Sequence, residues 1–125
     1  MAVGNAPFHA HVYYGPSERA AAQSVRAQLA NREEILFVGR MADGPVGPHP
    51  IPQFEVHFDA SGQPIVEALL RAAGLRALIH PLTDDDLADH TALATWIGEP
   101  LALDLSSLDP PGMNQGVARF GKSDF

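Results

Sequence analysis

The spacing of apolar and polar residues predicts four principal strands. Residues 8–14 are rich in aromatic and β-favouring side chains, and residues 54–58 alternate strictly between apolar and polar. Two short apolar runs, at residues 35–38 and 75–80, predict buried strands. The leucines within residues 101–105 alternate as well, which predicts a short edge strand.

Three segments between these strands have helical spacing. Ser17 is a suitable N-cap for a helix over residues 17–31, in which Val25 and Leu29 repeat on one face. A second helix begins at Pro64 and ends before Gly74. A third is expected from Thr83 to about residue 96. The glycine-rich, polar sequence beyond residue 110 predicts a loosely held tail.

The order of these elements, βαββαβ, predicts the α+β ferredoxin-like fold, with an antiparallel sheet and helices on one face. In this fold the first strand lies between the third and the fourth. We expect a single domain over residues 1–125, with a ferredoxin-like core at 7–106 and a C-terminal tail at 107–125. The uncovered face of the sheet requires a partner subunit, the C-terminal segment or a ligand. A second copy of the chain in that place would make a dimeric α+β barrel.

Composition excludes several classes of function. The chain has 8 Lys and Arg against 15 Asp and Glu, a net charge of -7, which argues against nucleic acid or an anionic membrane as partner. There is no cysteine, so a metal must be held by histidine, carboxylate or carbonyl groups. Glycine-rich phosphate loops, nucleophile elbows and HExxH motifs are missing. Without a secretory or membrane-spanning pattern, a cytoplasmic location is expected.

The predicted strands place many histidines on one face of the sheet. Successive side chains of a strand point to opposite faces, so the face away from the helices receives a polar set. Two histidines and one carboxylate on one side of a metal are typical of non-haem Fe(II) oxygenases, where open positions remain for substrate and dioxygen. A single histidine on a strand is more often a hydrogen-bonded structural residue. The polar set comprises His9, His11, Tyr13, Glu55, His57 and His80.

Two further histidines lie outside the strands. His49 stands between Pro48 and Pro50, which restrict its backbone, and a rigid histidine suits acid/base chemistry or substrate binding. The alternative is a solvated loop residue. His90 lies on the inward face of the predicted third helix, where a core histidine bonded to a backbone carbonyl is the alternative to a catalytic role.

Four stretches of the chain resemble the DOPA 4,5-dioxygenase family. The histidine motifs of that family fall at the five positions other than His57, with Glu55 as the carboxylate. The resemblance implies a ferredoxin-like fold, often dimeric, and extradiol cleavage of catechols, so a homodimer is expected. The stretches are FHAHVYY at 8–14, GPHP at 47–50 leading to FEV at 54–56, LIHPLT at 78–83 with DHT at 89–91, and WIGEPL at 96–101 with LDLS at 103–106.

This resemblance leads to a specific hypothesis. Non-haem Fe(II), held by His11, His80 and Glu55, would bind a catechol such as DOPA together with O2, and zinc is an alternative occupant. His49, His9 and His90 would serve as acid/base groups, and Tyr13 and His57 would contact the substrate. Two other readings remain open: a non-catalytic ligand-binding or dimerisation module, and a metal enzyme with a different metal and reaction.

Overall fold

The computed structural model describes residues 6–121. Its strands and helices follow the predicted order, and two short elements are added towards the C-terminus. In chain order they are β1 (Pro7–Tyr13), α1 (Arg19–Ala30), β2 (Ile35–Val38), β3 (Gln53–Asp59), α2 (Gln63–Ala73), β4 (Ala77–Pro81), α3 (Asp86–His90), β5 (Thr95–Ile97) and α4 (Gln115–Ala118).

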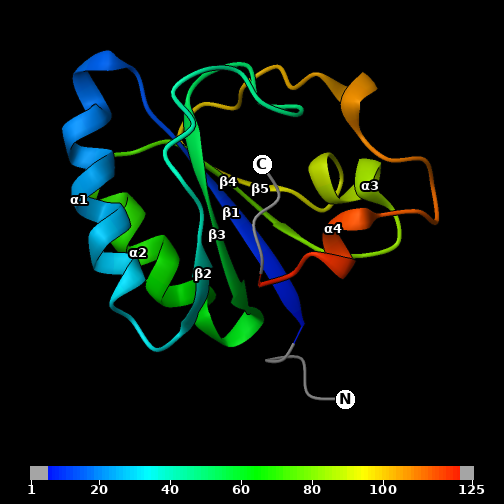
Figure 1. Ribbon diagram of the computed structural model, residues 1–125, viewed down its shortest axis with the longest axis horizontal. Helices are drawn as coiled ribbons and strands as arrows, with labels where there is room; N and C mark the ends of the chain where they lie inside the picture. Colours follow the sequence, from blue (N-terminus) through cyan, green and yellow to red (C-terminus); the bar gives the residue numbers. More distant parts are fainter. Residues whose placement is uncertain (1–5, 122–125) are drawn as a thin grey trace.

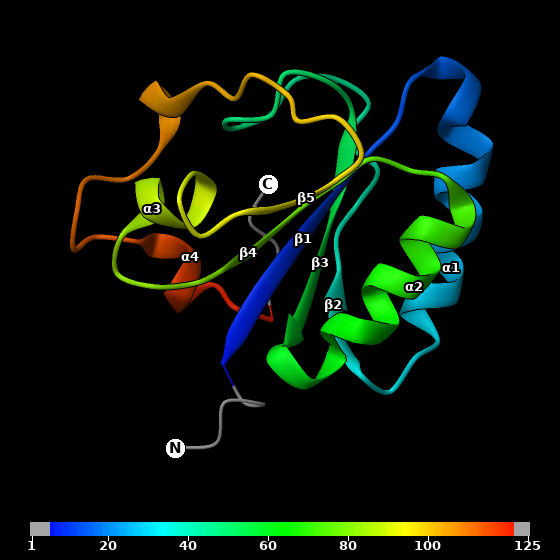
Figure 2. The same ribbon diagram turned by 180° about the vertical axis from the view of Figure 1, so that it is seen from behind.

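The strands form one antiparallel sheet in the order β2-β3-β1-β4-β5. The first strand therefore lies between β3 and β4, as the ferredoxin-like prediction requires. Helices α1 and α2 cover one face of the sheet (Figure 1). The short helices α3 and α4 lie on the other side, as Figure 2 shows from behind. The predicted fold class is confirmed.

The core between the sheet and the two long helices determines the register of the strands. Every second side chain of β1 and β3 is buried against α1 and α2. Each large apolar side chain that is fully buried contributes about 1.5–3 kcal/mol. A shift by one residue would exchange these side chains for the histidines between them, so the register is strongly favoured. The residues concerned are Ala10, Val12, Val25, Leu29, Phe54, Val56, Phe58, Val66 and Leu70.

The third helix is shorter than predicted. It ends at His90, and Thr91 leaves the helical conformation with φ -126° and ψ -89° while its hydroxyl donates to the carbonyl of Leu87. Residues 95–97 instead form β5, which pairs with β4. Threonine, tryptophan and isoleucine favour strands, and pairing with an otherwise open sheet edge decides between the two structures.

The C-terminal part of the chain also differs from the prediction. Residues 101–105 form no strand, and the Asp104 carboxylate caps a 3₁₀ turn at Leu105–Ser107. The expectation of a loosely held tail beyond residue 110 is wrong for residues 111–121. The Asn114 side chain donates to Thr83 and to Asp89, and α4 lies over the face of the sheet opposite α1 and α2. The C-terminal segment thus provides cover for this face, and the homodimer stays a prediction.

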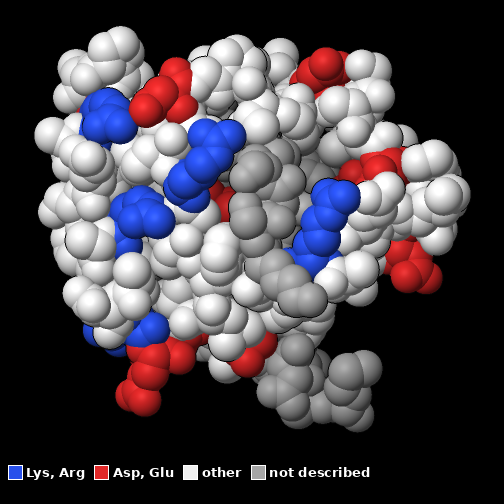
Figure 3. Space-filling view, viewed as in Figure 1, with Lys and Arg blue, Asp and Glu red and all other residues white. Residues whose placement is uncertain are grey.

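Charged side chains do not segregate over the surface seen in Figure 3, where positive and negative groups are interspersed. Within residues 6–121, no helix has both the length and the apolar character needed to cross a bilayer.

Candidate metal centre

Strand pairing brings the predicted polar set together. His9 on β1 lies opposite His57 on β3 and His80 on β4, and His11 lies opposite Glu55. These side chains are almost completely buried, with at most 2% of any of the five residues exposed. The predicted face of the sheet is therefore confirmed. It is a buried polar surface rather than a solvated one.

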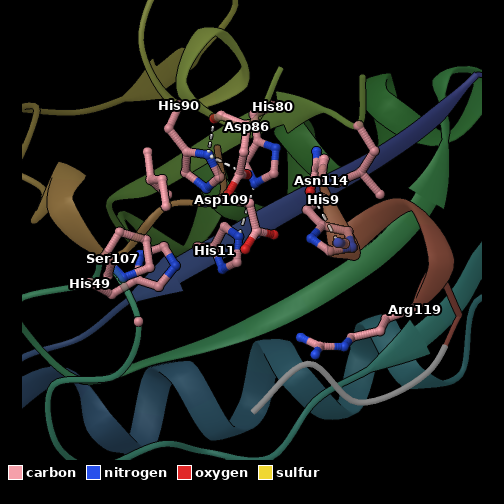
Figure 4. Close-up of a pocket in the computed structure, with 15 residues that line it drawn as sticks. His9, His11, His49, His80, Asp86, His90, Ser107, Asp109, Asn114 and Arg119 are labelled. Atoms are coloured by element: carbon pink, nitrogen blue, oxygen red, sulfur yellow. Dashed lines mark hydrogen bonds and ion pairs between the residues drawn. The ribbon is translucent and has the colours of Figure 1, made fainter. Parts of the chain in front are cut away.

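Five histidines meet in one cavity of about 130 Å³ (Figure 4). This volume is below the range of about 300–1,000 Å³ found for drug-sized ligands, so the cavity suits a small molecule. Pro48, Leu82 and Leu108 provide apolar contacts, and Arg119 lines it from the C-terminal segment. The histidines are His9, His11, His49, His80 and His90, accompanied by the carboxylates of Asp86 and Asp109.

Two of these imidazoles face each other with their lone pairs. The Nδ1–H of His80 donates to the carbonyl of Pro81 at 2.8 Å, and the Nδ1–H of His11 donates to Oε1 of Gln53 at 2.9 Å. In the neutral rings both Nε2 atoms are therefore unprotonated, yet they lie 3.1 Å apart. Two ligands at 90° around a metal with bonds of about 2.1 Å are separated by about 3.0 Å. This arrangement fits a shared cation.

A proton shared between the two Nε2 atoms is the alternative to a metal ion, and burial disfavours it. Desolvation lowers the pKa of His11 and of His80 well below the usual value, and neighbouring imidazoles lower it further. The pKa of His9 is lowered for the same reasons. The rings are thus neutral at physiological pH, which is the state that binds metal ions.

His49 is held differently. Its Nδ1 lies 2.7 Å from the hydroxyl of Tyr13, a group that can donate or accept. This contact is compatible with either tautomer, so it does not fix which nitrogen of His49 carries the proton. Burial lowers the pKa of His49 to about 3 and raises the pKa of Tyr13, which keeps the phenol protonated. Gly47, at φ 53°, makes the turn that presents this histidine.

Helix α3 supplies His90 and Asp86. Asp85 caps the helix, and the buried Asp89 carboxylate accepts hydrogen bonds from the backbone and hydroxyl of Thr83. His90 donates through Nδ1 to the carbonyl of Asp86 at 2.8 Å. This is the backbone bond of the structural alternative, and the ring also lines the cavity, so the catalytic role of His90 stays a prediction.

Two groups of donor atoms in residues 6–121 are close enough to hold an ion. One comprises His9, His11 and His80, and the other His9, Glu55 and His57. The predicted ligand set is divided between them, because Glu55 lies on the β3 side of His9 while His11 and His80 lie in the first group. Glu55, His57 and Tyr13 do not line the cavity.

Sequence reasoning missed several residues of the site. Gln53 orients His11, and strand alternation places it on the same face as Glu55 and His57, so the pattern contained this information. Asp86, in the first turn of the third helix, also lines the cavity. Asp109 and Arg119 lie in the segment for which no structure was expected.

An α+β fold with a buried, all-imidazole donor group beside a small cavity defines a candidate metalloprotein. The chain matches the Dopa 4,5-dioxygenase family over residues 8–107, and it belongs to that family. Arg119 lies beyond the matched residues.

Known relatives agree with this assignment. The chain is 32% identical to a DOPA 4,5-dioxygenase of Amanita muscaria over 111 residues, covering 81% of this chain and 49% of the relative. It is also 32% identical to an uncharacterized protein of Botryotinia fuckeliana, covering 79% and 61%. The chain thus spans only about half to three fifths of these relatives. A crystal structure of a candidate dioxygenase from Nostoc punctiforme is 37% identical, with a TM-score of 0.75 over 85% of this chain and 93% of that one.

Proposed function

We propose that this protein is a metal-dependent dioxygenase that opens the ring of a catechol by extradiol cleavage, with Fe(II) as its metal. The facing Nε2 atoms of His11 and His80 carry the proposal, because two buried nitrogens 3.1 Å apart, each with its Nδ1 placed to donate to an oxygen, favour a cation between them. Family membership and the activity named for the Amanita relative support the reaction class.

The geometry favours a different third ligand from the one that the sequence-based hypothesis named. His9 completes a group in which the donor atoms lie within 4.8 Å of one another, whereas Glu55 belongs to the other group. We therefore favour His9, His11 and His80 as the ligand set over His11, His80 and Glu55. A buried Nε2 of His9 that has no hydrogen-bond partner is consistent with this role.

The chain's own residues would bind the catechol and move its protons. A divalent iron in this group would supply Lewis acidity to the catechol hydroxyls and a route for electrons to dioxygen. Pro48, Leu82 and Leu108 would hold the ring and restrict water. His49 would accept a hydroxyl proton at Nε2 and return it during ring opening. Both oxygen atoms of O2 enter the product, so no external reductant is needed.

A zinc enzyme is the second candidate, because three imidazoles with an open position also form the catalytic site of zinc hydrolases. The donor set alone does not distinguish the two metals. The reaction with O2 does, since zinc has no redox chemistry.

The test is to strip the protein with a chelator, load it anaerobically with Fe(II) or Zn(II), and add catechols in air. We expect O2 uptake and ring-opened product in equal amounts with Fe(II) only. His11→Ala should abolish both, and the exposed Glu33→Gln should react normally. Absence of O2 uptake with every catechol, although iron is bound, would reject the dioxygenase.

A further inference from the structure

A buried carboxylate and imidazole lie behind the cavity without touching it. Oε2 of Glu55 is 3.5 Å from Nε2 of His57, and both side chains are shielded from solvent. Gly39 makes room for the carboxylate, because a Cβ there would lie 2.6 Å from Cγ of Glu55. The backbone is thus shaped around this Glu55–His57 pair.

The C-terminal segment determines where His57 holds its proton. The backbone N–H of Gly121 donates to Nδ1 of His57 at 2.8 Å. Because Nδ1 accepts, a neutral His57 carries its proton on Nε2, which is the atom that faces Glu55. Phe120 covers the same ring, stacked at 5.7 Å and an angle of 6°.

This proton distinguishes the pair from the metal-binding histidines. His11 and His80 donate through Nδ1, so their Nε2 atoms are unprotonated, whereas Nε2 of His57 carries a proton. A protonated nitrogen is no metal ligand. His9, Glu55 and His57 are close enough together to bind an ion. They form no second metal site as long as the N–H of Gly121 bonds to Nδ1 of His57 and keeps the proton on Nε2.

The pair is instead placed to act through His9. The rings of His57 and His9 stack at 3.8 Å with an angle of 15°, and donor atoms of Glu55 and His9 lie within 4.8 Å. Groups in the shell around a metal-ligating histidine commonly fix the orientation of its ring. Phe120 also stacks on His9, at 6.2 Å.

We propose that Glu55 and His57 are positioning residues for His9, and that Phe120 and Gly121 complete this support by fixing the proton on Nε2 of His57. The inference rests on the proposed function in one respect, that His9 is a metal ligand. It gives the C-terminal segment, which lies beyond the family match, a defined part in the site.

The tautomer is measurable without any activity. Long-range ¹H–¹⁵N spectra of the metal-free full chain should show His57 as the Nε2–H form and His80 as the Nδ1–H form. Gly121→Ala keeps the N–H but disfavours the left-handed backbone, at φ 85°, that aims it. This substitution should mix the tautomers of His57. Gly112→Ala, at φ 79°, imposes the same strain elsewhere and should not. An Nδ1–H form of His57 in the wild-type chain would overturn the inference.

Metal affinity tests the link to His9. We expect the wild-type chain to bind one Co(II), and Glu55→Gln and Gly121→Ala to bind one Co(II) about 10–100-fold more weakly. Glu33→Gln and Gly112→Ala should bind as wild type does. Two Co(II) ions per wild-type chain, or unchanged affinity in both test variants, would overturn the inference alone. If the wild-type chain binds no Co(II), the metal centre itself is rejected. The positioning role of Glu55 and His57 is then rejected as well.

Discussion

Two pairs of facing donors lie on the same side of the sheet, one on each side of His9. His11 and His80 approach to 3.1 Å, and His57 and Glu55 to 3.5 Å. The distances are similar, but the hydrogen bonds at the Nδ1 atoms of the histidines run in opposite directions. A carbonyl or amide oxygen accepts from the first pair, and a backbone N–H donates to His57. The second nitrogen of each ring thus decides whether the first can bind a metal.

The largest expected difference between the pairs is in metal content. His80→Ala should lose stoichiometric Fe(II), because one of the two facing lone pairs is gone, whereas His57→Ala should keep one Fe(II) per chain. Elemental analysis after loading and desalting measures both. One firmly bound iron in His80→Ala would show that the facing pair is not the site.

Acid should destabilise the metal-free protein strongly. The folded-state pKa values of His9, His11, His80 and His49 lie below the unfolded value of about 6.5, that of His49 at about 3. Between these values the unfolded chain binds more protons, so stability is fully present above about pH 6.5 and falls as the pH decreases. Each such histidine contributes about 1.4 kcal/mol per pH unit.

Urea unfolding at pH 7.5, 6.5 and 5.5 measures this loss. Saturating Zn(II) should reduce it, because bound metal competes with protons for the same nitrogens. A free energy of unfolding that does not change over this range would contradict the neutral, buried state of the cluster.

A substitution at Gly39 should have a smaller effect, on stability, through the Glu55–His57 pair. Gly39→Ala should destabilise the fold by about 1–3 kcal/mol, because the new Cβ would press on the Glu55 side chain. Gly44→Ala is the control, since no atom lies within 4 Å of its Cβ position. Equal free energies of unfolding for the two variants would show that Glu55 is not tightly enclosed.

Tyr13→Phe should have the smallest effect, about 1 kcal/mol of stability, through loss of the hydrogen bond to His49. Metal affinity should change little, because the Tyr13 hydroxyl bonds to His49 rather than to a member of either pair. If His49 moves protons, the pH profile of kcat should shift while KM stays nearly constant. An unchanged profile would argue against His49 as the acid/base group.

Much of the fold follows from local pattern. Alternation and apolar runs predict β1 to β4, and helical spacing with the positions of Pro64 and Gly74 predicts the two long helices. The expected N-cap Ser17 lies instead within a 3₁₀ turn, and α1 begins at Arg19. The same alternation placed the histidines and Glu55 on a common face, because strand periodicity is a property of the backbone and the apolar residues select which side is buried.

The tertiary structure decided what lies on each side of His9. The order of elements already predicted that β1 lies between β3 and β4, but only the packed side chains placed Glu55 in a different donor group from His11 and His80. Contacts distant in sequence also determined the end of the third helix, since β5 exists only through pairing with β4. The C-terminal segment has no periodicity, yet Gly121 sets the proton on His57, 64 residues away. Protonation depends on partners brought together in space, and a sequence read locally does not specify them.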